Sequence, residues 1–266
     1  MLIIRRYLLF VVFAINVLLL AVACTEPAPS IQPPPTAEPI PVHLWLGFED
    51  GTQPLADHVV ANYTAENVVI HTVFANGDVL LDDLAADQID VAFVYSLPPN
   101  PAVWFSPVAL DGVVLFVHPD NPLTDLNQQD GQAIFAGRGG QPWVLHTREN
   151  GAGVRTVFRD RLMAEQRVAI TAVTQTSEAA LHTAVAADPQ AIGYGSMANL
   201  PADLKPLSIN GMSANPNTVG TQQYLLTTPI YAAATAEPQR ELRALIGWLQ
   251  SAETQAELGG VYGRVR

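Results

Sequence analysis

Apolar residues alternate with polar ones in several short segments, and this period of two predicts β-strands. Between these segments apolar residues recur three or four positions apart, as in a helix with one buried face. Leu55, Val59 and Tyr63 form such a stripe after Pro54, a residue favoured in the first helical turn. The first part of the chain therefore predicts strands at 42–48, 68–74 and 90–94, with helices from 54 onward and around 79–84.

The order β-α-β-α-β is typical of a parallel sheet covered by helices. A polar turn follows each of the three strands, at 49–52, 76–78 and 95–96. In open α/β sheets, ligands bind beyond the carboxyl ends of the strands. We therefore expect these three turns to converge on one rim that carries a binding site.

The pattern repeats after a fourth predicted strand at 113–117. Residues 118–123, HPDNPL, have the composition of a crossing segment and predict a passage into a second lobe. The elements predicted beyond it are helix 128–135, strand 143–146, a glycine turn with its helix, strand 168–173, helix 178–187, strand 191–194, strand 225–233 and a helical hairpin at 238–258. We expect lobe 1 to comprise residues 42–117 and 225–266 and lobe 2 to comprise residues 118–224. A polar cleft between two such lobes suits a binder that closes about a hinge.

A glycine turn at residues 147–155, TRENGAGVR, carries the clearest candidate chemistry. Unpaired N–H groups at the start of a helix, with a dipole worth roughly half a positive charge, can hold an anion. Gly151 and Gly153 let a ligand approach the main chain, and Arg148 offers donors suited to carboxylate or phosphate oxygens. Apolar residues from Val154 onward would pack the helix on a sheet and leave its amino end free. The alternative is an ordinary turn with a surface arginine.

The first residues of the sequence predict an export signal. Residues 1–23 combine Arg5 and Arg6 with a long apolar run, and small residues precede Cys24, the only cysteine. This arrangement resembles a bacterial lipoprotein signal, in which the cysteine is lipidated and becomes the mature N-terminus. An uncleaved membrane anchor and ordinary secretion remain the alternatives. Residues 24–41 are a proline-rich linker, so we expect the domain outside the cell membrane, tethered to its outer face through Cys24.

Charge and residue types exclude several functions. The formal net charge is −12 and Lys205 is the only lysine, which argues against nucleic acid or an anionic membrane surface as a partner. The six histidines are scattered and form no H-E-x-x-H pair. Ser196 lacks the glycine that completes a nucleophile elbow. We expect a monomer without a metal, a cofactor or catalytic activity.

Five segments, taken in order, resemble one family. They are NPLTDLNQQDGQAIFAGR, TRENGAGVR, AIGYGSMANL, GTQQYLLTTPIYAA and LIGWLQSAETQAELGGVYG. Together they are similar in order and spacing to the phosphate-type solute-binding proteins of ABC importers. The resemblance implies a type II periplasmic-binding-protein fold, with two α/β lobes, a hinge, and an oxyanion held in the cleft between them without a metal. It also implies the membrane permease of an ABC importer as a partner.

The glycine turn matches the family's phosphate-binding turn only in part. The family's cradle binds phosphate through an arginine, main-chain amides and two hydroxyl side chains. Arg148, Gly151 and Gly153 match that pattern, but Ala152 and Val154 stand at the hydroxyl positions. Each hydrogen bond lost to a charged ligand costs roughly 1.5–3 kcal/mol. Affinity for phosphate therefore depends on groups that compensate for two missing donors.

In lobe 1, the resemblance places the turns 49–52 and 76–78 where the family has turns rich in serine and threonine. These turns bring carboxylates to the rim, and a carboxylate repels a dianion unless it is protonated or accepts a proton from the ligand. Thr52 and Ser96 are the hydroxyl residues expected in the cleft. The candidate ligand-binding residues are therefore Thr52, Ser96, Arg148, Gly151, Ala152, Gly153 and Val154.

Three functions remain open. The first is a lipid-anchored binding protein that delivers phosphate or a related oxyanion to an importer, which Arg148 favours. The second is the same fold with a cationic or zwitterionic solute, met by Glu49, Asp50 or Asp78. The third is a divergent receptor or scaffold without tight small-molecule binding. The loss of both hydroxyl side chains from the cradle favours the second and third.

Overall fold

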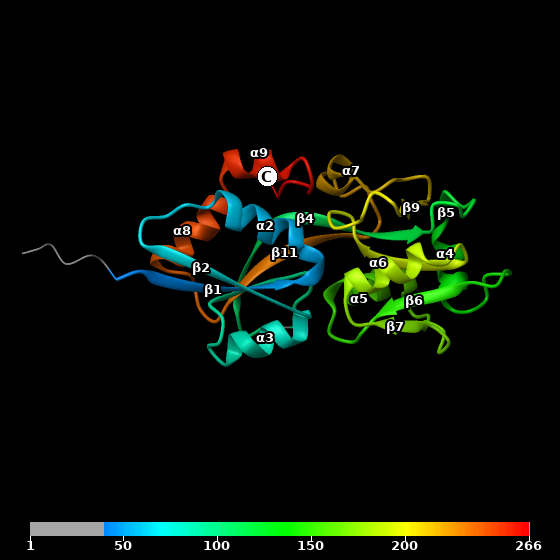
Figure 1. Ribbon diagram of the computed structural model, residues 1–266, viewed down its shortest axis with the longest axis horizontal. Coiled ribbons are helices and arrows are strands. Elements are labelled where there is room, and N and C mark those ends of the chain that lie inside the picture. Colours follow the sequence, from blue (N-terminus) through cyan, green and yellow to red (C-terminus); the bar gives the residue numbers. More distant parts are fainter. Residues whose placement is uncertain (1–39, 100, 266) are drawn as a thin grey trace, which may run out of the picture. The chain divides into compact units, whose positions relative to one another are not determined.

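One continuous run of paired strands organises residues 40–99 and 101–265, the part of the chain that this computed structural model describes. Neighbouring strands pair in the following order (Figure 1): β2 (Val68–Ala75), β1 (Val42–Glu49), β3 (Val91–Val94), β11 (Thr227–Ala234), β4 (Trp104–Val117), β8 (Ala191–Ser196), β6 (Val144–Arg148) and β7 (Val173–Gln175). Beside this path, β9 (Lys205–Pro206) pairs with β4. The predicted signal, Cys24 and the linker up to residue 39 lie outside the described residues.

Lobe 1 is built on the three parallel strands predicted at its start. β1 (Val42–Glu49) lies between β2 (Val68–Ala75) and β3 (Val91–Val94), and the connections contain α2 (Gln53–Asn62) and α3 (Gly77–Ala85). The alternation of β1 places Leu44, Leu46 and Phe48 in one core with α2. On the opposite face of the sheet, Leu80 and Leu84 of α3 form a second core with β3. The predicted β-α-β-α-β order is confirmed.

β4 (Trp104–Val117) is longer than the predicted strand at 113–117 and joins the two halves of the sheet. Its first part pairs antiparallel with β11 (Thr227–Ala234), and from Val113 it pairs antiparallel with β8 (Ala191–Ser196). The sheet is therefore mixed, because β4 and β11 pair antiparallel with their neighbours at its centre, whereas the strands on either side are parallel. These two strands cross between the halves of the sheet. Below, lobe 1 means the elements on the β1 side and lobe 2 those on the β8 side. The predicted residue boundaries of the lobes stay a prediction.

Lobe 2 carries β6 (Val144–Arg148) between β8 and β7 (Val173–Gln175), all parallel, with α4 (Gln128–Phe135) and α6 (Glu178–Ala186). After the glycine turn, α5 (Gly153–Val157) continues as a π-helix, η2 (Phe158–Met163). Phe158 stacks on Tyr194 with ring centroids 3.9 Å apart. That contact fixes the helix in the core of lobe 2.

The strand predicted at 168–173 is wrong in position, because β7 begins only at Val173. The N–H of Ala169 donates instead to the carbonyl of Phe135, at the end of α4. Ile170, an apolar residue that suggested a strand, is 99% exposed. A turn held by α4 replaces the expected sheet pairing.

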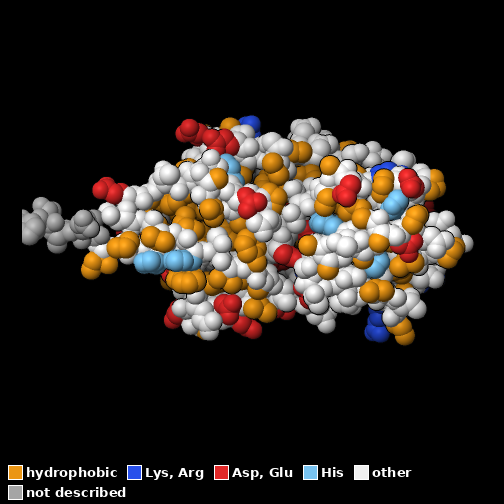
Figure 2. All heavy atoms as spheres, in the orientation of Figure 1, with side chains coloured by type: hydrophobic (Ala, Val, Ile, Leu, Met, Phe, Trp, Pro, Cys, Tyr) orange, Lys and Arg blue, Asp and Glu red, His pale blue; other side chains and the backbone are white. Residues whose placement is uncertain are grey.

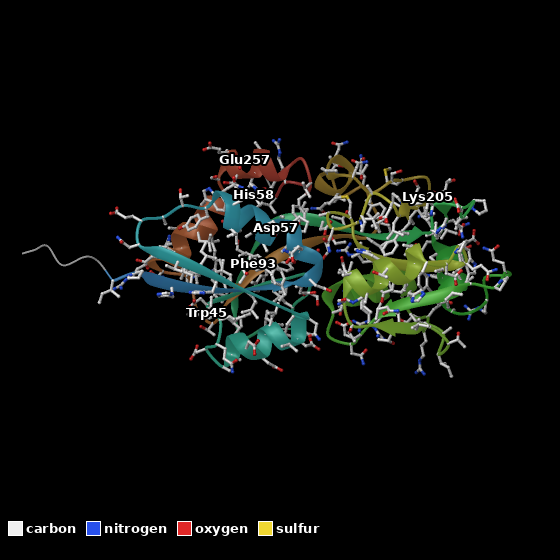
Figure 3. All side chains as sticks on the ribbon, viewed as in Figure 1. Trp45, Asp57, His58, Phe93, Lys205 and Glu257 are labelled. Atoms are coloured by element: carbon white, nitrogen blue, oxygen red, sulfur yellow. The ribbon has the colours of Figure 1, made fainter. Side chains whose placement is uncertain are left out.

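The helical hairpin predicted at 238–258 is confirmed as α8 (Arg240–Leu249) and α9 (Ala252–Leu258), and it packs on lobe 1. His58 of α2 stacks on Trp248 of α8, and its Nε2 atom lies 3.5 Å from a carboxylate oxygen of Glu257 on α9 (Figure 3). The remaining elements are short: η1 (Asp50–Thr52), β5 (Asp125–Leu126), β9 (Lys205–Pro206), β10 (Ser208–Ile209) and α7 (Pro216–Gly220). Among the described residues, no helix is long and apolar enough to cross a membrane.

Candidate functional site

Polar groups of both lobes meet at the carboxyl ends of the lobe 1 strands. Lobe 1 supplies the end of β1 and the residue after β3, β4 supplies the point where it crosses, and lobe 2 supplies the ends of β6 and β8 and the starts of α5 and α6. We call these residues the interlobe cluster: Glu49, Asp50, Tyr95, Asp111, Arg148, Gly153, Glu178, Ser196 and Asn199.

Glu49, the last residue of β1, is held by main-chain donors from both lobes. One carboxyl oxygen accepts the N–H of Tyr95 in lobe 1 at 3.0 Å, and the other accepts the N–H of Gly153 in lobe 2 at 2.9 Å. The side chain is 2% exposed. Burial raises the pKa of Glu49 to about 8; the two N–H groups oppose this rise and the neighbouring Asp50 adds to it. At neutral pH the site therefore holds a largely uncharged carboxyl group.

The side chain of Arg148, at the end of β6, donates its hydrogen bonds to carboxylates of the same chain. Its Nε and Nη2 atoms donate to the two carboxylate oxygens of Glu149 at 3.0 and 2.9 Å, and Nη1 donates to Asp50 of lobe 1 at 3.1 Å. The other oxygen of Asp50 accepts the N–H of Glu178 at 2.6 Å. Burial alone would lower the pKa of Arg148, but the hydrogen bond to Glu149 and the charge of Asp50 raise it overall. Arg148 is thus a buried cation that ties Asp50 to lobe 2.

Glu178 and Asp111 extend the cluster behind Asp50. Glu178 accepts the N–H of Ser196 at 2.9 Å and the side-chain amide of Asn199 at 3.1 Å. Asp111 accepts the hydroxyl groups of Ser196 at 2.5 Å and Tyr95 at 2.8 Å. Burial raises the pKa of Glu178 to about 7 and that of Asp111 to about 6. Both carboxyl groups are held by hydrogen bonds rather than by a partner cation.

The cluster has more carboxyl groups than cations, which matters for any ligand. Acidic side chains are also spread over the face shown in Figure 2, where basic ones are few, as the net charge of −12 leads one to expect. An anion therefore has to find its donors within the cluster, against the field of the protein. Within the described part of the chain, no three His, Cys, Asp or Glu side chains are placed to hold a metal ion.

Comparison with known proteins identifies the family of this fold. The family model described as a PBP superfamily domain matches residues 73–253, more than half of the chain. The chain belongs to the PBP superfamily. Its mixed α/β architecture is the type II periplasmic-binding-protein fold, as the sequence predicted, and this is a binding-protein fold that is typically non-enzymatic.

Solved structures of similar proteins come from transport and from regulation. A putative phosphate ABC transporter substrate-binding protein from Clostridium perfringens, solved with bound phosphate, is 18% identical, with a TM-score of 0.77 over 85% of this chain and 100% of that one. For an ABC-type phosphate transport receptor from Vibrio cholerae, the identity is 18% and the TM-score 0.66, over 84% and 100%. The CcmR regulatory domain from Synechocystis, solved in complex with 2-PG, is 16% identical, with a TM-score of 0.59 over 78% and 95%. At these low identities, the TM-scores show a shared fold and nothing finer.

The amino end of α5 in this PBP-superfamily protein is not free, contrary to the expectation from the sequence. The carboxyl group of Glu49 accepts the N–H of Gly153 there. The helix is also shorter than expected, since α5 ends at Val157 and the π-helix follows. The sequence pattern marked the turn correctly but gave no sign of a side chain from another lobe that fills it.

The other predicted residues divide between the cluster and its support. Gly151 has a φ of +86°, and its carbonyl accepts the N–H of Asp78 across the lobes at 3.2 Å. Ala152 and Val154 are buried in the hydrophobic core. The Thr52 hydroxyl donates to the main-chain carbonyl of Glu49 at 2.7 Å. Ser96 is half-buried beside Tyr95, and among the described residues its side chain makes no hydrogen bond to the cluster.

Sequence reasoning placed Tyr95 in a turn on the rim, but it did not name Asp111, Glu178, Ser196 or Asn199 as members of the site. One signal was available. Asp111 is a lone carboxylate in an apolar strand, and a buried charge needs partners. The remaining residues join the site through contacts between segments that are distant in the sequence. Ser196, for example, reaches Asp111 only because β8 pairs with β4.

Proposed function

We propose that this PBP-superfamily protein is an extracytoplasmic solute-binding protein of an ABC importer that binds phosphate or a related oxyanion between its lobes. It acts without catalysis, cofactor or metal ion and passes its ligand to a membrane permease. The family match and the likeness to two solved phosphate-transport proteins support this proposal.

The observation that carries the proposal is the position of the Glu49 carboxyl group. Its two oxygens accept main-chain N–H groups from Tyr95 and Gly153, one from each lobe. Arg148 lies in the same cluster, and main-chain N–H groups and arginine are the usual partners of oxyanions. The donors that now hold a carboxyl group suit the oxygens of phosphate, once the ligand displaces the carboxyl groups of the chain.

The surplus of carboxyl groups favours a second candidate, a cationic or zwitterionic solute. Asp50 is the most exposed of these groups in the cluster, with 28% of its side chain accessible, and Glu149 beside it is 19% accessible. An ammonium or guanidinium group of a solute would find acceptors there and would take the place that Arg148 now fills. The titration described below separates the two candidates.

Calorimetric titration of the full-length chain tests the proposed ligand. We expect saturable binding of phosphate that is weaker at pH 8 than at pH 6, because Glu49 and Glu178 gain negative charge over that range. Sulfate, molybdate and an amino-acid mixture are the comparison ligands. A lack of saturable binding for every anion would contradict the proposal, and binding of a cationic amino acid alone would select the second candidate.

We also propose that Cys24 carries a lipid that anchors the protein to the outer face of the cell membrane. The placement of the only cysteine directly after an apolar segment that is predicted to be an export signal supports this proposal. Cys24→Ser is expected to prevent lipidation, measured by incorporation of a labelled fatty acid in the cells that make the protein. Equal labelling of the variant and the natural chain would rule out Cys24 as the anchor.

A further inference from the structure

We infer that Glu49 is a built-in occupant of the interlobe oxyanion site, which latches lobe 1 to lobe 2 until a ligand displaces it. The inference deepens the proposed function and rests on it for the identity of the ligand. It assigns Glu49 a role in specificity, because a solute binds only if it competes with this carboxyl group.

The space around the Glu49 carboxyl group is shaped by one glycine from each lobe. A Cβ atom on Gly77 would stand 2.6 Å from Oε1 of Glu49, and a Cβ atom on Gly153 would stand 2.6 Å from Oε1 and 2.9 Å from Oε2. Heavy atoms do not approach so closely without displacement. The carboxyl group therefore fills a slot that exists only because both positions lack a side chain.

The residues around Glu49 add further contacts between the lobes. Asp50 accepts Nη1 of Arg148 at 3.1 Å and the N–H of Glu178 at 2.6 Å, while its carbonyl accepts the side-chain amide of Asn199 at 3.3 Å. Next to them, the N–H of Asp78 donates to the carbonyl of Gly151 at 3.2 Å. The end of β1 thus acts as the latch, and the protein supplies by itself the contacts that a ligand would make between the lobes.

Charged and titratable groups from several elements lie in the interlobe cluster around Glu49 or beside it. They are Asp50 after β1, Asp78 of α3, Tyr95 after β3, Asp111 of β4, Arg148 at the end of β6, Glu149 after it, Arg155 of α5 and Glu178 of α6. Most are acidic, and burial keeps the Glu49 carboxyl group largely uncharged at neutral pH, as its pKa of about 8 implies. A ligand that displaces it therefore breaks hydrogen bonds, but no direct ion pair of Glu49.

An internal occupant lowers the apparent affinity for a ligand by the fraction of molecules in which the site is free. Removing the occupant should restore the intrinsic affinity. Glu49→Ala is therefore expected to bind phosphate at least tenfold more tightly than the natural chain at pH 7, measured by calorimetric titration of the full-length protein. Glu165→Ala, which removes an exposed glutamate, is the matched control and should bind like the natural chain.

Hydrogen exchange measures the latch without any ligand. In Glu49→Ala, the main-chain amides of Tyr95 and Gly153 lose their acceptor, so exchange in peptides that contain them should be at least tenfold faster. Glu49→Asp, whose shorter side chain withdraws the carboxyl group, should show the same direction of change. Unchanged exchange in both variants overturns the inference, provided that the amides of β8 remain protected and so show that the variants are folded.

The two measurements separate the inference from the proposed function. If no anion binds to any variant, the proposed function fails, while faster exchange still supports the latch. If exchange is faster and phosphate binds the natural chain and Glu49→Ala equally, Glu49 does not compete with the ligand and the inference is overturned.

Gly77→Ala provides an independent check of the slot. Alanine is ordinarily the better residue in a helix, yet here its Cβ would meet Oε1 of Glu49 at 2.6 Å. The substitution should reduce protection in the peptides containing Tyr95 and Gly153, and the effect should disappear when it is combined with Glu49→Ala. Equal effects of Gly77→Ala with and without the Glu49 carboxyl group would contradict the assigned slot.

Discussion

Arg148→Ala is expected to lower the free energy of unfolding by about 3 kcal/mol, at the low end of the cost of breaking a buried ion pair. Arg148 is 1% exposed and holds Asp50 of lobe 1 and Glu149 of lobe 2. Without it, two carboxylates face each other with no cation between them. Both remain partly accessible, at 28% and 19%, and solvent relieves part of the repulsion, which is why the low end applies.

Guanidinium unfolding of the full-length chain, followed by tryptophan fluorescence, measures this change. Arg167→Ala removes an exposed arginine and is the matched control, with an expected change below about 0.5 kcal/mol. Arg148→Lys should fall between the two, because lysine keeps the charge but cannot hold both carboxylates with a planar fork. A cost for Arg148→Ala no larger than that of the control would show that the ion pairs contribute nothing.

The same substitution tests the candidate site. If an oxyanion binds between the lobes, Arg148→Ala should weaken its binding at least tenfold, since a lost hydrogen bond to a charged ligand costs roughly 1.5–3 kcal/mol. The variant must be compared under conditions where it is folded. Unchanged affinity would remove Arg148 from the ligand-binding residues, whatever its effect on stability.

The fold was accessible from the sequence because its lobes are built from local, periodic segments. The alternation in β1 and the stripe of Leu55 and Val59 are properties of short windows, and the structure buries these side chains as the pattern requires. The segment at 168–173 shows the limit. Its apolar residues suggested a strand, yet the contact of Ala169 with the end of α4 replaces sheet pairing. A tertiary contact decided that segment, and no window of the sequence contains it.

Only the part of the site whose residues are neighbours in the sequence could be predicted. The glycine turn and Arg148 are neighbours in the sequence, so their spacing was visible, and the missing hydroxyl groups at Ala152 and Val154 were equally plain. Its partner Asp50 comes from a segment far from Arg148 along the chain and joins it only where lobe 1 meets lobe 2. The sequence showed that carboxylates reach the rim, but which atom each one contacts depends on how the lobes meet.

Stability should fall as the pH rises from 6.5 to 8, by about 2 kcal/mol. Burial is the main cause that raises the pKa of Glu49 to about 8 and that of Glu178 to about 7, from ordinary values of 4.5. In this range the unfolded chain has already released both protons, whereas the native state still binds them in part. Since the native state binds more protons, stability declines with rising pH. The contribution of Glu49 is fully present below pH 4.5 and is lost as the pH passes about 8.

The lower limit of that range is set by His182, which acts in the opposite direction. Burial lowers its pKa to about 4 from 6.5, so between these values the unfolded chain binds more protons and stability rises with pH. Above pH 6.5 this effect fades, and the carboxyl groups dominate. Guanidinium unfolding at half-unit intervals from pH 6.5 to 8.5 should therefore show a monotonic decline.

Glu49→Gln, which cannot titrate, should flatten the part of the decline above pH 7.5, because Glu178 is by then mostly ionised. A profile that stays equally steep in this variant would mean that Glu49 is ionised in the native cluster at neutral pH. Its contacts with Tyr95 and Gly153 would then have to stabilise a buried charge.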